Sequence, residues 1–187
     1  MFDIIIVGAG PAGTSAALFS AKAGKKTLLV DNDKGMTKRA WIENHYGVSE
    51  ISGPDLIETG KKQAQKFGTE IIESTVANVE KTEAGFVVQT EDKGTFNAKH
   101  VILASGVSVN LAETIGLTTK DGLEPRIKTV FDVNEKGETN VPGIWAAGTC
   151  AGVSVHTIIT AGDGAKVAIN VISEINGERY VDHDILK

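Results

Sequence analysis

The glycine-rich segment at residues 8–13, Gly-Ala-Gly-Pro-Ala-Gly, constrains the fold of this chain more than any other feature. It follows a short run of largely β-branched residues, 3–7, with the pattern of a strand that is buried on both faces. An alanine-rich segment with good helix propensity comes next, at 12–23, and Gly24 can end that helix in a left-handed conformation. A second strand at 27–30 then completes a βαβ unit.

The three glycines of this segment have separate tasks in a phosphate-binding turn. Gly8 permits the tight turn out of the strand, Gly10 lets a pyrophosphate approach the backbone, and Gly13 allows the helix to pack close to the sheet. The helix start adds free N–H groups and a partial positive charge. Asp31, at the end of the second strand, is placed to accept hydrogen bonds from an adenosine ribose, and Asp33 takes that role if the strand ends later. The alternative is a tight βα turn without a ligand.

Two further helices are predicted outside this unit. Pro54 suits the first turn of a helix that runs to Phe67, with Gly68 as its stop. Residues 157–176 have the apolar spacing of a closing helix, and Gly177 follows it.

The chain between these helices has β-rich patterns. Short pieces that alternate with turns predict an antiparallel meander, at 70–72, 75–80, 86–89 and 95–97. Buried strands are expected at 100–103 and 144–147, and the polar stretch between them contains one candidate strand near 126–130. The fold class is therefore α/β, a Rossmann-type domain of three layers with a central parallel sheet and an added antiparallel β-meander.

Composition excludes several classes of protein. The chain has 187 residues, which suits a single domain over 1–187. A net charge of −5 argues against nucleic acid or an anionic membrane as the main partner, and no apolar run is long enough to span a bilayer. Cys150 is the only cysteine, so neither an internal disulfide nor a CxxC redox pair is possible. We expect a cytoplasmic protein without a metal site.

Several motifs follow one another along the chain. They are D-I-I-I-V-G-A-G-P-A-G at 3–13, I-E-N-H-Y-G at 42–47, S-G-P-D-L at 52–56, K-F-G at 66–68, V-I-L-A-S-G at 101–106, V-P-G-I-W-A-A-G at 141–148 and T-A-G-D-G-A at 160–165. In this order they resemble the FAD-binding domain of the low-molecular-weight thioredoxin reductases and their flavoprotein relatives. The resemblance implies FAD as the cofactor and disfavours an NAD-binding dehydrogenase.

The resemblance also shows what this chain lacks. In that family a complete NADPH-binding domain, with a second glycine fingerprint and the CxxC, is inserted after the segment that matches Ala104-Ser105-Gly106. Here the family's return segment already follows at 113–122. We therefore expect one FAD-binding domain assembled from 1–108 and 109–187, joined near Val109–Asn110 with the NADPH domain absent.

The resemblance assigns the cofactor-binding residues one by one. It places the ADP half of FAD on the glycine-rich turn and Asp31, the adenine near Val76, and the flavin ring and ribityl chain at the other end of the site. The residues implied are Gly8, Gly10, Pro11, Ala12, Gly13, Asp31, Asn44, Val76, Ala104, Ser105, Gly106, Gly148, Thr149, His156 and Thr157. The helix that starts near Thr157 would point its positive end at the flavin.

Three departures from the family pattern concern the flavin end of the site. The family's Gly-Asp is Gly148-Thr149 here, so a carboxylate that bonds the ribityl chain becomes a hydroxyl. The Arg-Gln before the closing helix is Val155-His156, and the Gly-Gly-Gln loop is shortened to Gly35-Met36. We expect weaker FAD binding and a retuned flavin environment, since one neutral hydrogen bond contributes about 1 kcal/mol.

Several single residues allow two interpretations. His156 either donates to the flavin carbonyl or is an ordinary surface histidine, and Cys150 either lies near the cofactor or is small buried packing, which we favour. Trp41, His45 and Tyr46 either border the flavin or pack the loop around Asn44. The pair Lys38 and Arg39 either attracts an acidic partner or is simply solvated, which we favour.

The expected function is that of an FAD-dependent oxidoreductase which takes electrons from a separate donor, free NAD(P)H or a small redox protein, and passes them to an unknown acceptor. Flavin supplies the redox chemistry in such proteins, and the chain supplies binding and electrostatics. The alternative is a non-catalytic flavin module, such as a carrier, a sensor or a subunit of a larger complex. The resemblance further implies a homodimer. The sequence identifies neither donor nor acceptor.

Overall fold

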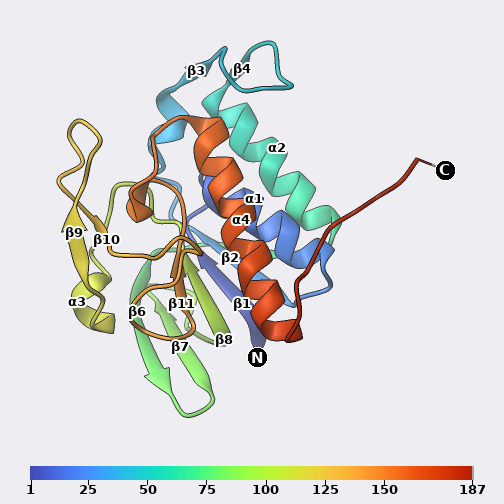
Figure 1. The fold of residues 1–187 in the computed structure, drawn as a ribbon. Helices are drawn as coiled ribbons and strands as arrows, with labels where there is room; N and C mark the ends of the chain where they lie inside the picture. The colour runs from blue at the N-terminus through green and yellow to red at the C-terminus, as the bar shows by residue number, and fades with distance from the viewer. Residues whose placement is uncertain (187) are drawn as a thin grey trace.

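A parallel sheet forms the centre of the structure, which is a computed structural model that describes residues 1–186 (Figure 1). Its strands lie in the order β5-β2-β1-β8-β11, and each runs parallel to its neighbour. Their bounds are β5 Glu70–Glu73, β2 Thr27–Asp31, β1 Phe2–Val7, β8 Thr95–Leu103 and β11 Ile144–Ala146. This order confirms the predicted βαβ unit, because β1 and β2 are adjacent and the helix Pro11–Lys22 connects them.

Three helices cover one face of the sheet. They are α1 Pro11–Lys22, α2 Gly53–Lys66 and α4 Thr157–Asn176. Alternate residues of β1 point to opposite faces, so Ile4 and Ile6 pack with the helices while Ile5 and Val7 pack on the other side. Within residues 1–186 no helix is both long and apolar enough to cross a membrane.

A β-rich layer covers the opposite face. It contains β6 Val76–Thr82 and β7 Gly85–Thr90, which form an antiparallel meander with the first half of β8. The short helix α3 Ala112–Ile115 and the hairpin of β9 Thr119–Asp121 and β10 Thr129–Phe131 complete it. Helices, parallel sheet and this layer confirm the predicted three-layer α/β fold.

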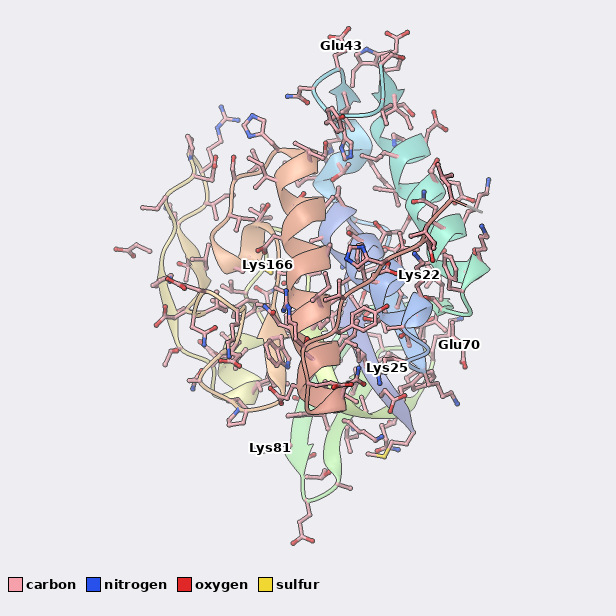
Figure 2. All side chains as sticks on the ribbon, turned by 45° about the vertical axis from the view of Figure 1, so that its right-hand side comes forward. Lys22, Lys25, Glu43, Glu70, Lys81 and Lys166 are labelled. Atoms are coloured by element: carbon pink, nitrogen blue, oxygen red, sulfur yellow. The ribbon has the colours of Figure 1, made fainter. Side chains whose placement is uncertain are left out.

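The remaining short elements lie near the start of α2 and after β11. They are the 3-10 helix η1 Met36–Arg39, the small hairpin of β3 Trp41–Ile42 and β4 Ile51–Ser52, and the 3-10 turn η2 Thr149–Ala151. The β3–β4 loop with Glu43 and the β6–β7 hairpin with Lys81 lie at opposite ends of the molecule (Figure 2).

Three strand predictions were wrong in detail. Residues 70–72 belong to β5, which pairs parallel with β2 and lies outside the meander, because α2 carries the chain back to the edge of the parallel sheet. The pieces predicted at 95–97 and 100–103 form the single strand β8, whose Ala98 pairs with both Phe2 and Phe86. The strand expected near 126–130 starts at Thr129 and pairs with β9, which the polar pattern did not indicate.

A short turn connects β8 to α3. The Ser105 hydroxyl donates to the carbonyl oxygen of Ser108 at 2.6 Å, and the Ala112 N–H donates to that of Val109 at 2.9 Å. The predicted join near Val109–Asn110 lies inside this turn. The chain thus passes from β8 to α3 in a few hydrogen-bonded residues.

Close packing of α4 against α1 depends on Gly164. A β-carbon at this position would overlap the backbone of Ala12, whereas a β-carbon at Gly162 on the same helix would meet nothing within 4 Å. The two helices could not keep this distance with any larger residue at Gly164.

We therefore expect Gly164→Ala to lower the free energy of unfolding by about 2–4 kcal/mol, because the helices must separate. The matched variant Gly162→Ala should leave it unchanged or raise it by about 0.5–1 kcal/mol, since alanine favours the helix. Urea denaturation of both variants measures the difference. Equal effects of the two substitutions would show that the approach of α4 to α1 is not tight.

Candidate functional site

The carboxyl ends of β1, β2, β8 and β11 lie at one edge of the sheet, because these strands run in the same direction. Helices α1 and α4 both begin at this edge: Gly10 is the N-cap of α1, and Gly148, which follows β11, lies next to Ala12 and Thr160. Ligands of open α/β sheets bind at such an edge. Residues that the sequence predicts to bind a dinucleotide lie at this edge of the sheet.

Gly8 and Gly13 hold the turn between β1 and α1 closed. Gly8 has φ of +103°, and a β-carbon there would overlap the carbonyl oxygen of Ala104. A β-carbon on Gly13 would overlap the carbonyl oxygen of Gly8. The Ala104 N–H in turn donates to the carbonyl oxygen of Val7 at 2.8 Å. The turn, the helix and the end of β8 therefore form one tightly packed unit.

Gly10 differs from these two glycines, because a β-carbon there would meet nothing within 4 Å. The space in front of this residue is open at the N-terminus of α1, where Pro11 is the first helical residue. The first turn of α1 contains no acidic residue, so its free N–H groups and the helix dipole are available to an anion. This arrangement fits a phosphate group.

Asp31 is the last residue of β2, so the expectation for Asp31 in preference to Asp33 agrees with the strand's end. Its Oδ1 accepts the Asp33 N–H at 2.9 Å, and Lys61 of α2 forms an ion pair with its Oδ2. Asp33 is exposed and pairs with Lys38 instead. Arg39 is exposed, as the favoured interpretation expects, whereas Lys38 is half-buried and engaged in this ion pair.

Val76 lies near Asp31 in the folded chain. The carbonyl oxygen of Asp31 accepts the N–H of Ser74 at 2.9 Å, two residues before Val76 begins β6. The residue proposed for the ribose and the residue proposed for the adenine therefore belong to the same end of the site.

Gly148 and Asp163 connect β11 to α4 at the other end of the site. Gly148 has φ of +80°, and its N–H donates to Oδ2 of the buried Asp163 at 2.7 Å. Asp163 Oδ1 pairs with Lys166 at 2.6 Å. Thr149, next to Gly148, is half-buried at the start of η2. The motif T-A-G-D-G-A contains Asp163, but its sequence does not predict this contact, because only the fold brings Asp163 to Gly148.

The N-terminus of α4 is linked to the loop that contains Asn44. Nδ1 of His45 and Oγ1 of Thr157, the first residue of α4, are hydrogen-bonded at 3.0 Å. His156, the N-cap, is exposed, and its Nδ1 lies 2.8 Å from the Ser154 hydroxyl. Asn44 itself is exposed beside His45. The structure thus brings these predicted residues together at one corner of the edge.

Trp41 and Tyr46 flank this corner without being buried by it. The two residues are 63% and 93% exposed, which argues against the interpretation that they pack the loop. His45 differs from them, because its hydrogen bond to Thr157 fixes it to α4.

Cys150 is buried packing, as favoured from the sequence. Its Sγ lies 3.3 Å from the carbonyl oxygens of Leu103 and Ala147. Burial raises the pKa of the Cys150 thiol, which keeps the group protonated and poorly nucleophilic.

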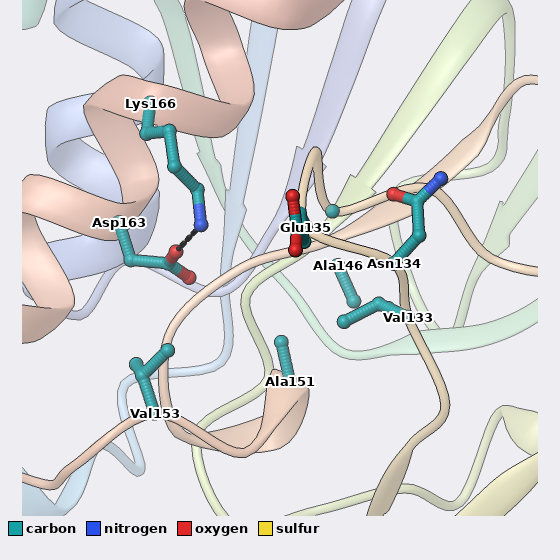
Figure 3. Close-up of a pocket in the computed structure, with 9 residues that line it drawn as sticks. Val133, Asn134, Glu135, Ala146, Ala151, Val153, Asp163 and Lys166 are labelled. Atoms are coloured by element: carbon teal, nitrogen blue, oxygen red, sulfur yellow. Dashed lines mark ion pairs between the residues drawn. The ribbon is translucent and has the colours of Figure 1, made fainter.

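Two hollows lie beside this edge, and none of the glycines of the glycine-rich turn lines either of them, although Pro11 lines the second. A hollow of about 230 Å³ opens between α4 and the loop after β10, next to the Asp163–Lys166 pair (Figure 3). A second, of about 130 Å³, lies between α1, α2 and His45. Both are small beside the roughly 300–1,000 Å³ of typical ligand pockets. A dinucleotide would therefore have to lie along the open edge of the strands.

The order of the parallel strands and the glycine-rich turn place this chain in the class of Rossmann-type α/β proteins. The family described as pyridine nucleotide-disulphide oxidoreductase matches it over residues 2–117 and 41–165. The chain belongs to that family.

Relatives share part of the sequence, and solved structures have a similar fold. Thioredoxin reductase of Aquifex aeolicus (strain VF5) is 39% identical over 112 residues, which are 57% of this chain and 34% of that protein. The match thus spans about a third of such a relative's length. The crystal structure of the atypical thioredoxin reductase TRi from Desulfovibrio vulgaris Hildenborough superposes with a TM-score of 0.85 at 20% identity, covering 95% of this chain and 99% of that one.

A second solved structure has the same fold. The ferredoxin-flavin thioredoxin reductase from Clostridium acetobutylicum superposes with a TM-score of 0.73 at 20% identity, covering 94% of this chain and 98% of that one. At these identities the likeness concerns the fold alone.

The link between His45 and Thr157 leads to a test of the corner at α4. We expect Thr157→Val to free the loop at 43–50, because it removes a hydrogen bond that contributes about 0.5–1.5 kcal/mol. Amide hydrogen exchange in that loop should become about 2–10 times faster. Ser154→Ala, which removes the hydroxyl next to His156, should leave it unchanged. Unaltered exchange in Thr157→Val would show that the link does not hold the loop.

Proposed function

We propose that this chain is an FAD-binding oxidoreductase that takes electrons from a separate donor and passes them to a separate acceptor. The observation that carries the proposal is the edge at the carboxyl ends of the strands. There the turn at Gly10 is open, and Gly148 lies next to both Ala12 of α1 and Thr160 of α4. Membership of the oxidoreductase family supports the redox class, and the cofactor and the reaction of this chain are our inference.

The residues along the edge fit the parts of FAD in order. Asp31 and Val76 would hold the adenosine at one end, and the N–H groups of α1 behind Gly10 would hold the pyrophosphate. Gly148 and Thr149 would approach the ribityl chain, and Asn44 with the start of α4 would border the ring. Thr149 offers a hydroxyl where the resemblance expects a carboxylate, so binding there relies on a neutral hydrogen bond.

A bound flavin supplies two-electron chemistry, in which a hydride equivalent is accepted and later given up. This chain's contribution is electrostatic and positional. The N-terminus of α4 directs partial positive charge toward the place where negative charge develops on reduction. Asp163 fixes the backbone of Gly148, and His45 fixes the loop of Asn44 to Thr157. These contacts keep the groups that face the ring in place without reorganisation.

The electron donor and the electron acceptor would be molecules separate from this chain. In residues 1–186 the glycine-rich dinucleotide turn occurs once, and the lone cysteine is buried and protonated, so a dithiol relay within this chain is not available. Free NAD(P)H or a small redox protein would supply the electrons. A protein donor is a candidate because a ferredoxin-flavin thioredoxin reductase has the same fold. We further propose a cytoplasmic homodimer built from one FAD-binding domain per chain.

The second candidate function is a non-catalytic flavin module. Thr149 favours it, because loss of the carboxylate weakens the grip on the ribityl chain. The oxidoreductase is favoured because the proposed FAD-binding residues are present along the whole strand edge, from Gly8 to Thr157.

An anaerobic titration of the FAD-loaded chain with NADH and with NADPH separates these functions. An open-faced oxidoreductase predicts bleaching of the flavin absorbance band at about one equivalent of nicotinamide. Reduction by a protein donor predicts no bleaching with nicotinamide but rapid bleaching with reduced ferredoxin. A flavin that only dithionite reduces would contradict the proposal and indicate a carrier or a sensor.

A further inference from the structure

Lys61 reaches from the middle of α2 to the carboxylate of Asp31 at the end of β2. Both side chains are largely shielded, with exposed fractions of 20% for Lys61 and 8% for Asp31. Asp31 Oδ2 is closed off from solvent and has no well-formed hydrogen bond in the part of the chain described, so the ammonium is its electrostatic partner. The pair joins two elements that meet at the proposed adenosine end of the site.

We propose that Lys61 is a positioning residue for the adenosine ribose of FAD: it holds the Asp31 carboxylate turned so that one oxygen accepts a ribose hydroxyl. This inference rests on the proposed binding of FAD at the strand edge. Lys61 acts through Asp31 and needs no contact with the cofactor itself.

The geometry of the carboxylate leaves one place for a ligand. Oδ2 is buried against Lys61, and Oδ1 already accepts the Asp33 N–H at 2.9 Å. A carboxylate oxygen has capacity for a second hydrogen bond, so Oδ1 can accept one more donor. Asp31 would therefore hold one hydroxyl of the ribose and not clamp two.

Lys61 is the cation that can perform this task. Lys38 is occupied by the exposed Asp33, and Glu73, which lies opposite Asp31 in β5, adds negative charge to this end of the sheet. A shielded carboxylate without a counter-charge is strongly disfavoured in its ionised form. Without Lys61 the carboxylate would turn toward solvent, and it would no longer present an acceptor to the ribose.

Lys62 provides a matched control on the same helix. It is 70% exposed and pairs with Glu58 one turn earlier, at 3.4 Å. Removing its charge changes the surface of α2 without touching Asp31.

The experiment compares the dissociation constants of FAD and of an FAD analogue whose adenosine ribose lacks both the 2′- and the 3′-hydroxyl. The wild-type chain should prefer FAD by about tenfold, the effect of one hydrogen bond to a charged acceptor. Lys61→Met should weaken FAD by about tenfold and reduce the preference to less than about threefold. Lys61→Arg should restore it, and Lys62→Met should bind as the wild type does.

Asp31→Asn keeps the shape of the side chain and serves as a second variant, which should also lose the preference. Equal weakening of FAD and the analogue in Lys61→Met would overturn the inference, because it would mean that Lys61 supports only the fold. FAD binding by the wild type with no preference over the analogue would overturn it as well and leave the proposed function intact. Failure of the wild type to bind either molecule would overturn both.

Discussion

The rest of the structure depends on a backbone contact between the glycine-rich turn and the end of β8. Gly8 turns out of β1 against the carbonyl oxygen of Ala104, and Gly13 packs the first turn of α1 on Gly8 itself. No side chain fits in either contact, so the strand, the turn and the helix take a single arrangement. Gly164 repeats this principle, because it brings α4 against the backbone of Ala12. Two helices thereby start at one edge of one sheet.

That shared start links the packing to the chemistry we propose. Each helix N-terminus carries unsatisfied N–H groups, and the sheet brings both within one edge that is open at Gly10. Charged groups then fix the two ends of the edge: Lys61 holds Asp31 near the proposed adenosine, and Asp163 holds Gly148 near the proposed ribityl chain. An elongated, negatively charged dinucleotide is the ligand that such an edge suits.

Local patterns in the sequence predicted much of this fold but few of the contacts in the site. The βαβ unit and the helix Thr157–Asn176 follow from glycine placement and apolar spacing, and the structure confirms both. Whether Glu70–Glu73 pairs parallel or antiparallel depends on where α2 returns the chain, which no pattern of four residues contains. Lys61 and Asp163 were missed for a similar reason, since their partners are distant in the sequence. Asp163 lay in a recognised motif, whereas Lys61 is one of several lysines on a polar helix.

The most direct test of this account is equilibrium binding of FAD to the wild-type chain and to Gly10→Ala, measured by dialysis with the unfolding free energy of both proteins as the control. We predict one FAD per chain, and in Gly10→Ala an affinity lower by at least about tenfold, because the new methyl group occupies the space of the pyrophosphate. The unfolding free energy without FAD should fall by less than about 1 kcal/mol, since the methyl group meets no neighbour in the fold. No binding by the wild type, or equal binding by Gly10→Ala, would contradict the claim that this strand edge is the cofactor site.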